Sequence, residues 1–329
     1  MVTPLSTPLQ WTSTSSSRLD RILKAQFPHV SNRALKLWFK QHKVFVNGTS
    51  RPPGYNVQEG DLIQLPHGTS QLIPREAEST LRLEYIDKHE DVIVVNKPHQ
   101  AHCHPLNPWD LDTITQAVVR DFPHIKDVGS PREPGLLHRL DYETSGILLF
   151  ANSQESFQRL SQSRDEKQWD KRYLAWLHGI VTTPAQLLIP ITHHPSQPSK
   201  MIAFLDPSQK HKGHVQQAHS WFVPLAHRNH QTLCMIKIIT GVRHQIRIHA
   251  STWGHPIVGD PLYATNSQAA ERMMLHASAL NVPSPLTGQT LQWCALPSFV
   301  NDLEAVECKR SFERESPPTK IVTAEELRS

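Results

Sequence analysis

The segment from His138 to Gly146 brings together residue types that enzymes use for chemistry. Its sequence HRLDYETSG places Asp141 between a basic pair and a Thr-Ser-Gly turn, directly before the apolar run Ile147–Phe150. A short apolar run bounded by Gly146 and Asn152 is typical of a buried strand, so Asp141 is predicted on a rigid loop that leads into the core. A carboxylate there must be paired or hydrogen-bonded to stay ionised. This layout favours a catalytic role for Asp141 over a purely structural one.

A short helix is predicted from residue 243 to residue 253. Apolar or small residues recur at helical spacing from Ile246 onward, and Gly254 is a natural helix terminator. Arg243 and Arg247 then share a separate face of this helix. Arginine is suited to a buried carboxylate, because its planar group can hold both oxygens and stays charged when water is removed.

The composition indicates a folded chain with more than one domain. The 329 residues can hold a sizeable core, and no apolar run approaches the roughly 20 residues that a membrane span needs. The start of the chain has neither the basic nor the apolar part of an export signal. The four cysteines are far apart and form no C-x-x-C, so neither a disulfide framework nor a zinc site is predicted and a reducing cytoplasm fits. They are Cys103, Cys234, Cys294 and Cys308.

Positive charge is concentrated near the N-terminus. The formal net charge is +4, while residues 18–61 alone hold eight basic residues against three acidic ones. Arg33, Lys36 and Lys40 fall on one face of a predicted helix. Such a stripe is typical of a module that binds a polyanion, although a merely solvated helix face would look the same.

The local signals in this basic region predict a small α+β module. Ser17 is predicted to cap a first helix that ends at Pro28, and Ser31 to cap a second helix. The run Val44–Gly48 is predicted as a strand that enters an Asn-Gly turn, and Leu62–Leu65 as another strand.

Five segments, in the same order along the chain, resemble the RluA family of RNA pseudouridine synthases. HRLDYETSG matches the active-site motif H-R-L-D-x-x-T-S-G of that family. The other matching segments are Asn96–Pro98 with His104–Pro105, Lys171–Ala175, Thr240–His249, and Gly254–Asp260 with Leu275–Ala277. The resemblance covers about residues 81–300, and about fifty N-terminal residues resemble the small RNA-binding module of the S-four type.

The resemblance implies three catalytic residues. Asp141 would be the ionised carboxylate, Arg247 the cation that supports it, and Tyr173 the ring that stacks on the target base. Arg139 is the candidate for filling the stack that the extruded base vacates, since guanidinium planes stack well on bases, although an ordinary ion pair with Asp141 is the alternative. The other residues predicted to bind RNA are His138, Thr144, Arg243, His244, Gln245, Arg33, Lys36 and Lys40. Val242 stands where the family has Arg, which puts an RNA contact in question more than the chemistry.

The implied reaction requires no cofactor. Conversion of uridine to pseudouridine breaks the bond from N1 to C1′, rotates the base and joins C5 to C1′, without redox change or imported group. We therefore expect neither a nucleotide cofactor nor a metal, and the pair His102 and His104 lacks a fourth ligand nearby. The base must leave its stack, which costs a few kcal/mol. Whether the carboxylate attacks the sugar, attacks the base or acts through a glycal stays open.

The expected fold is α+β: a mixed, largely antiparallel sheet with flanking helices, preceded by the small α+β module. The predicted order is a flexible tail at 1–16, the S-four-type module at 17–66, a linker at 67–80, the catalytic domain at 81–314 and a flexible tail at 315–329. The expected partner is RNA, with ribosomal RNA favoured over transfer RNA, because family members with the extra module often act on large-subunit ribosomal RNA. No membrane or obligate protein partner is expected, and the expected location is the cytoplasm.

Three alternatives accompany this prediction. A catalytically silent RNA-binding or ribosome-assembly factor would keep the fold, yet the presence of Asp141, Tyr173 and Arg247 favours an enzyme. A synthase that acts on transfer RNA would share the same residues. A metal-free glycosidase needs a second carboxylate across the pocket, and Glu143 lies too close in sequence to fit that geometry.

Overall fold

The computed structural model describes residues 9–28, 30–65, 79–106, 110–264, 270–313 and 320–328, apart from the side chain of Arg33. Its contacts divide the chain into two units, Met1–Arg82 with His102–Gly135, and Leu83–Ala101 with Leu136–Ser329. Nearly all of the predicted linker at 67–80 lies outside the described residues. No helix in the described ranges has the length and apolar character needed to cross a membrane.

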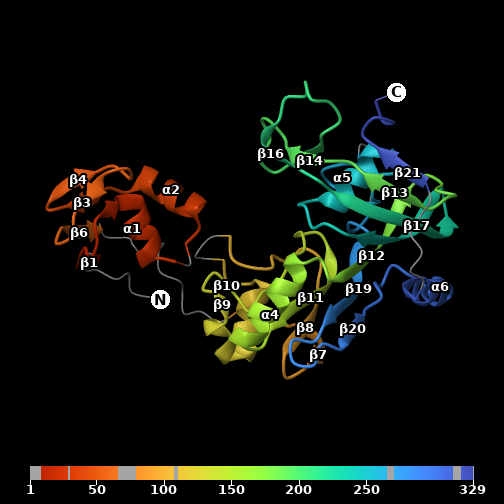
Figure 1. Cartoon of the computed structure of the whole chain (residues 1–329), viewed down its shortest axis with the longest axis horizontal. Coiled ribbons are helices and arrows are strands. Elements are labelled where there is room, and N and C mark those ends of the chain that lie inside the picture. The colour runs from red at the N-terminus through yellow and green to blue at the C-terminus, as the bar shows by residue number, and fades with distance from the viewer. Residues whose placement is uncertain are drawn as a thin grey trace. The chain divides into compact units, whose positions relative to one another are not determined.

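The N-terminal residues form two helices and two small sheets (Figure 1). The elements are β1 (Leu9–Thr12), β2 (Ser17–Arg18), α1 (Leu19–Gln26), α2 (Asn32–Gln41), β3 (Val44–Val46), β4 (Thr49–Arg51), β5 (Asn56–Val57) and β6 (Leu62–Leu65). One sheet has the order β1-β6-β3-β4, and β2 pairs with β5. The apolar faces of both helices pack with the strands into one buried cluster that includes Leu19, Leu23, Trp38, Val44 and Ile63.

The caps and turns of this region confirm some predictions and correct others. Ser31 caps α2, since its hydroxyl accepts a hydrogen bond from Ala34 N at 3.0 Å. Ser17 does not cap α1, because it lies in β2 and the first helical turn follows Arg18 instead. The Asn-Gly turn is confirmed: Asn47 and Gly48 both have positive φ, 50° and 76°, which a tight hairpin requires.

The predicted tail at 1–16 is wrong for its described part. Strand β1 pairs antiparallel with β6, from Leu9 opposite Leu65 to Thr12 opposite Leu62. Trp11 packs against the buried cluster of the two helices, and its ring meets that of Phe27 edge-on at 6.4 Å. This pairing joins residues 50 to 56 positions apart, so local sequence patterns do not reveal it.

The second part of the first unit runs from His102 to Gly135. It contains α3 (Ile114–Asp121), the 3-10 helix η2 (Pro123–Asp127), β9 (Gly129–Ser130) and β10 (Glu133–Pro134). Thr113 and Gln116 form a reciprocal cap at the start of α3. Arg120 on the same helix donates to Leu81 O at 3.0 Å.

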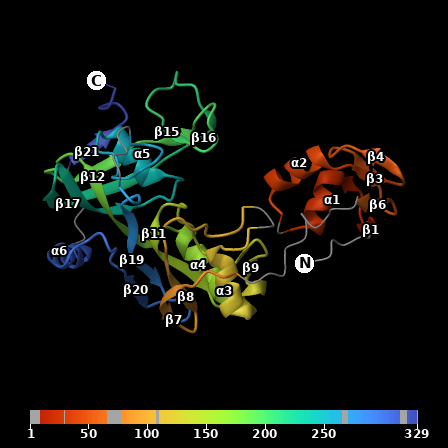
Figure 2. The same cartoon turned by 180° about the vertical axis from the view of Figure 1, so that it is seen from behind.

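The other unit is built on a ten-stranded sheet (Figures 1 and 2). Its strands are β7 (Glu84–Lys88), β8 (Val92–Lys97), β11 (Ser145–Ala151), β12 (Asp170–His178), β13 (Ala185–Leu188), β17 (His219–Arg228), β18 (Gln231–Ile238), β19 (Leu275–Pro283), β20 (Thr290–Cys294) and β21 (Lys320–Thr323). The order is β21-β13-β17-β18-β12-β19-β11-β8-β7, with β20 beside β19. Only the β11–β19 and β13–β21 pairs are parallel among the described strands, so the predicted mixed, largely antiparallel sheet is confirmed.

Helices and a second small sheet complete this unit. The helices are α4 (Gln154–Asp165), α5 (Gln245–Thr252) and α6 (Asp302–Phe312), and the small sheet is β14 (Ile191–His193), β15 (Met201–Ala203) and β16 (Lys212–Gln216). Helix α5 confirms the helix predicted at 243–253, with slightly narrower limits. The predicted C-terminal tail at 315–329 is wrong where it is described, because β21 pairs with β13 and buries Val322.

Candidate active site

Asp141 lies on a turn that the first residues of β11 hold in place. Thr144 N donates to Asp141 O at 3.1 Å and closes the turn. Immediately after it, Gly146 pairs with Ala277 of β19. Gly146 has a φ of +116°, and a Cβ atom there would lie 2.3 Å from Ala277 O. The Thr-Ser-Gly sequence thus allows two backbones to approach closely, and this contact fixes the position of Asp141.

A buried lysine holds the same turn from the other side. Lys97 at the end of β8 is 0% exposed, and its ammonium donates to Pro98 O at 2.9 Å, to Ala101 O at 2.8 Å and to Tyr142 O at 3.3 Å. Three carbonyls use all three donors of the ammonium. Because Tyr142 follows Asp141, this lysine links the end of β8 to the loop that carries the carboxylate.

Arg247 on α5 holds two carboxylates at once. Its Nη1 donates to Asp141 Oδ2 at 3.2 Å. Its Nε and Nη2 donate to Oδ2 and Oδ1 of Asp260, both at 2.8 Å. Arg247 is 3% exposed and Asp260 is 0% exposed, so the two-bond pair is the buried anchor and Asp141 is the more accessible partner.

The anchor is itself fully hydrogen-bonded. Asp260 Oδ1 also accepts from Leu262 N at 2.8 Å and from Tyr263 N at 3.1 Å. Burial acts to lower the pKa of Arg247, yet hydrogen bonds and negative charge from Asp260, with a contribution from Asp141, hold that pKa above its ordinary value. The guanidinium therefore stays charged beside Asp141.

His244 and Tyr263 border the same carboxylate. Nε2 of His244 lies 3.9 Å from Asp141 Oδ1, and its Nδ1 lies 2.7 Å from the hydroxyl of Tyr263. The Tyr263 ring also packs against the guanidinium of Arg247, 5.1 Å from ring centre to carbon. Burial lowers the pKa of His244 to about 4, against the opposing pull of Asp141, so the ring is neutral at neutral pH.

The predicted catalytic residues lie in this one unit. Asp141 and Arg247 are in direct contact. Tyr173 lies on β12, buried in the hydrophobic cluster against which Leu140 packs. Leu140 is the residue before Asp141, so this cluster brings the tyrosine and the carboxylate loop to the same region of the core.

The predicted RNA-binding residues separate into accessible and enclosed groups. Arg139 and Arg243 are exposed, and Arg243 also donates to Pro198 O at 3.3 Å and Ser199 O at 3.0 Å. Thr144 is only 2% exposed. On α2 of the N-terminal region, Lys36 and Lys40 are exposed, while the side chain of Arg33 lies outside the described structure.

Gln245, predicted to bind RNA, lies enclosed in the fold. Gln245 is 3% exposed, and its amide oxygen accepts from Thr240 Oγ1 at 2.7 Å and from Val242 N at 3.0 Å. Its amide nitrogen donates to His219 O and Ser220 Oγ, both at 2.9 Å. Every donor and acceptor of the side chain is used inside the fold, so nothing is left for RNA.

The contacts of His138 also favour a structural role. Its Nε2 accepts from Leu149 N at 3.2 Å, and its ring meets the ring of Trp169 edge-on. Burial, with help from nearby Lys171 and Arg164, lowers the pKa of His138 to about 3. A neutral ring bonded to the backbone of β11 supports the turn rather than a ligand.

Sequence reasoning missed three residues of the site: Lys97, Asp260 and Tyr263. Asp260 lies in one of the five matching segments, and its neighbour offered a signal. Gly259 has a φ of +76°, and a Cβ there would lie 2.2 Å from Arg272 O. A glycine required by close backbone approach, followed directly by an aspartate, marks a carboxylate placed in a buried position.

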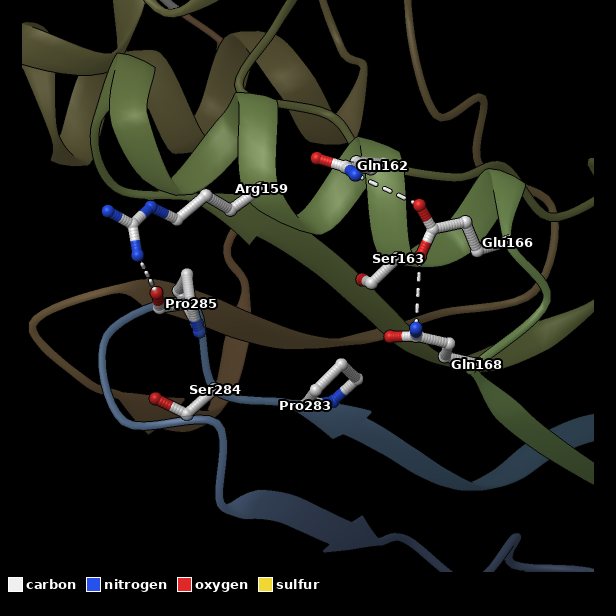
Figure 3. Close-up of a pocket in the computed structure, with 8 residues that line it drawn as sticks. All are labelled: Arg159, Gln162, Ser163, Glu166, Gln168, Pro283, Ser284 and Pro285. Carbon is white, nitrogen blue, oxygen red and sulfur yellow. Dashed lines mark hydrogen bonds between the residues drawn. The ribbon is translucent and has the colours of Figure 1, made fainter.

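A pocket of about 180 Å³ lies elsewhere in this unit, on α4 and the end of β19 (Figure 3). Several of its polar side chains are already hydrogen-bonded within the fold. Gln162 and Gln168 both donate to Glu166, and Arg159 donates to Pro285 O at 2.8 Å. A ligand would have to displace these internal bonds, so the Asp141 cluster remains the candidate active site.

Comparison with known proteins agrees with this geometry. Residues 91–252 match the family model for RNA pseudouridylate synthase. Ribosomal large subunit pseudouridine synthase D of Escherichia coli strain K12 is 28% identical over 309 residues, which cover 89% of this chain and 91% of that protein. This chain belongs to the RluA family of RNA pseudouridine synthases. It is an isomerase that converts uridine in RNA to pseudouridine.

Other relatives and solved structures extend the comparison. The synthase D of Pasteurella multocida is 29% identical over 307 residues, and an RNA pseudouridine synthase of Aquifex aeolicus is 27% identical over 260 residues. They cover 88% and 78% of this chain, and the matches span 91% and 80% of those proteins. Human RNA pseudouridylate synthase domain containing 1 covers 74% of this synthase and 99% of its own chain, with a TM-score of 0.59 at 24% identity. Human RNA pseudouridylate synthase domain containing 4 covers 71% of this chain and 94% of its own chain, with a TM-score of 0.52 at 23% identity. These structures show the pseudouridine synthase fold.

Proposed function

We propose that this synthase isomerises uridines of large-subunit ribosomal RNA and that Asp141 is its catalytic carboxylate. The names of the bacterial relatives support the choice of RNA. The proposed site residues rest on one observation: Arg247 binds a single oxygen of Asp141 and leaves the other without a hydrogen bond from the arginine. An ionised carboxylate with one oxygen held and one available is suited to attack the sugar or to remove a proton.

The proposed roles follow from position. Asp141 supplies the reacting oxygen, and Arg247 binds the other oxygen and orients the carboxylate. Tyr173 stacks on the target base from the hydrophobic cluster beside Leu140. Arg139 is exposed on the same loop, where a guanidinium plane can occupy the stack that the extruded base leaves.

Replacement of Asp141 tests the proposed catalysis. Asp141→Asn keeps the size of the side chain and removes its charge, so it should bind RNA normally and lose isomerisation by at least about a thousandfold. Glu143→Gln is the matched control, because it removes a carboxylate two residues away that has no proposed role. Single-turnover formation of pseudouridine in a ribosomal RNA fragment measures both. Turnover by Asp141→Asn within tenfold of wild type would exclude the assignment.

The choice of RNA needs a separate experiment. Pseudouridine positions should be mapped in a deletion strain and its parent, in ribosomal and transfer RNA together. We expect positions in large-subunit ribosomal RNA to lose the modification. Loss confined to transfer RNA would replace the proposed substrate and leave the proposed chemistry intact.

We further propose that residues 17–66 form an S-four-type RNA-binding module, with residues 67–80 as a linker and 81–314 as the catalytic domain. The excess of basic residues at 18–61 supports this, as does the exposure of Lys36 and Lys40 on α2. Arg33 belongs to the same proposed stripe. The stripe should contribute to affinity rather than to chemistry, because it offers only positive charge to the RNA backbone and the proposed chemistry belongs to Asp141.

Charge removal on α2 tests the module in the intact chain. Lys36→Gln with Lys40→Gln should weaken RNA binding and reduce the slope of log affinity against log salt by about 1.5–2, while the single-turnover rate at saturating RNA is unchanged. Lys309→Gln with Lys320→Gln is the matched control, since these two lysines are also exposed and lie near the other end of the chain. Equal salt slopes for the two pairs would mean that the α2 stripe is only a solvated face.

A further inference from the structure

The hydrogen bonds around Tyr263 determine which nitrogen of His244 carries the proton. The hydroxyl of Tyr263 accepts from Met201 N at 2.9 Å and lies 2.7 Å from His244 Nδ1. A phenol has one proton to donate. If Nδ1 carried the ring proton, the hydroxyl would accept twice and its own proton would face no acceptor in these contacts. If the hydroxyl donates to Nδ1, each of these groups is satisfied, and the ring proton is on Nε2.

The Nε2 proton then faces the free side of the catalytic carboxylate. Nε2 lies 3.9 Å from Asp141 Oδ1, which is too long for a direct hydrogen bond. His244 Cα holds this position in a left-handed conformation, with a φ of 57°, directly before the first residue of α5. The ring is 7% exposed, so few solvent contacts compete for its proton. The Nε2–H group therefore lies beside the reacting oxygen of Asp141 without donating a hydrogen bond to it.

We propose that His244 is a further catalytic residue, whose Nε2–H donates a hydrogen bond to the uracil carbonyl oxygen next to the glycosidic nitrogen, and that Tyr263 is the positioning residue that sets this tautomer. The proposal rests on the proposed role of Asp141. The carbonyl oxygen at C2 of uracil is close to C1′, so a base whose sugar faces Asp141 Oδ1 brings this oxygen to the donor. Because the ring is neutral, it does not form an ion pair with Asp141 and leaves the carboxylate reactive.

The chemistry needs a donor at this place. When the bond from N1 to C1′ breaks, its electron pair stays on the uracil and is shared between N1 and the carbonyl oxygens. The base then rotates, C5 bonds to C1′, and the proton lost from C5 is balanced by the proton gained at N1. His244 keeps its own proton throughout and stabilises the charge on the detached base by a hydrogen bond that strengthens as the charge develops.

Variants of His244 separate this donor from a structural role. His244→Ala should slow the single-turnover rate at saturating RNA by about ten- to a hundredfold, with little change in RNA affinity. His244→Gln should restore the rate to within about fivefold of wild type, because its amide N–H reaches a position similar to that of Nε2. Melting curves show whether both variants are folded. If His244→Ala lowers stability, the recovery of the rate in His244→Gln still separates the hydrogen-bond donor from a structural role.

Altered substrates identify the acceptor atom. RNA with 2-thiouridine at the target replaces the carbonyl oxygen by sulfur, a weak acceptor. It should slow the wild type and make His244→Ala cost less than about threefold further. RNA with 2′-deoxyuridine at the target should leave the full His244→Ala penalty in place. If the penalty instead disappears with 2′-deoxyuridine, the donor serves the ribose 2′-hydroxyl and the proposal is wrong.

Tyr263 provides an independent test of the tautomer. Tyr263→Phe should slow the wild type but have little further effect in the His244→Gln background, because an amide has no alternative tautomer. Nitrogen-15 shifts of the His244 ring should show a protonated Nε2 and a bare Nδ1. A protonated Nδ1, or a His244→Ala rate within twofold of wild type, would overturn the proposal. Where the His244 variants contradict the proposal, an inactive Asp141→Asn in the same assay would show that only the role of His244 fails. An active Asp141→Asn would show that the proposed site fails as a whole.

Discussion

Replacement of Asp260 by asparagine should damage both stability and catalysis, although Asp260 faces another protein side chain rather than the open side of the site. Asp260 is 0% exposed and accepts two hydrogen bonds from Arg247 at 2.8 Å each. In Asp260→Asn, the guanidinium loses its buried counter-charge and faces an amide NH2 group at one of these positions. Arg247 should then shift toward Asp141, so the catalytic carboxylate loses its free oxygen.

The size of the effect follows from burial. Removing one partner of a buried ion pair costs about 3–5 kcal/mol, because the remaining charge is left without compensation. Asparagine can still accept from Leu262 N and Tyr263 N through its carbonyl oxygen, so about 3 kcal/mol is the expected loss in free energy of unfolding. In a domain of about 150–250 residues each kcal/mol lowers Tm by about 2–4 °C, which gives a fall of about 6–12 °C.

Thermal melting and single-turnover kinetics on the same preparations test this reasoning. Asp141→Asn is the comparison, since Asp141 has a single hydrogen bond from Arg247 and a side chain that is 26% exposed. Its Tm should fall by only about 2–4 °C, from a loss of about 1 kcal/mol, while its activity is abolished. Asp260→Asn should show the larger fall in Tm and a rate at least about tenfold below wild type. A Tm for Asp260→Asn within 2 °C of wild type, together with a normal rate, would refute the role of Asp260 as the anchor.

Three further outcomes are expected. Lys97→Met should lower the free energy of unfolding by about 2–4 kcal/mol and reduce the catalytic rate, because three carbonyls, including that of Tyr142, lose their donor; unchanged urea unfolding would contradict this. Gly146→Ala should give little folded protein, since its Cβ would lie 2.3 Å from Ala277 O, and normal soluble yield and melting would show that β11 can move away. Burial lowers the pKa of His249 to about 4 from an ordinary value of 6.5, so the unfolded chain binds the extra proton and the free energy of unfolding should fall by about 1.4 kcal/mol per pH unit between those values. The fall of urea midpoints from pH 7 to pH 5 should be smaller in His249→Gln, and an identical fall would exclude this residue as its cause.

Much of the local structure could be predicted because its signals are local. The apolar run Ile147–Phe150 lies in β11, as expected from its composition. Ser31 caps α2, where a small hydroxyl precedes a helical apolar pattern. Arg247 faces Asp141, as the resemblance implied.

The remaining features depend on contacts between distant residues. Gln245 looks like a ligand-binding residue in a motif rich in polar groups, and only the folded chain shows that Thr240 and Ser220 use up its amide. Asp260 is the main partner of Arg247 because the chain turns back after α5, a geometry that no periodic pattern encodes. Ser17 failed as a cap because pairing of β2 with β5 takes that residue into a strand.

The place of β19 in the sheet has a consequence for when the enzyme becomes active. Strands β7, β8 and β11 come from residues 84–151, and β12, β13, β17 and β18 come from residues 170–238. In the described sheet, β19 at Leu275–Pro283 lies between β11 and β12 and joins them. A growing chain therefore carries Asp141 and Arg247 before it has the strand that holds their halves of the sheet together. At about 5–20 residues per second, synthesis from the end of β11 to the start of β19 takes about 6–25 s. The active site is complete only once β19 has been made, so a nascent or truncated chain that lacks β19 should be unable to modify RNA.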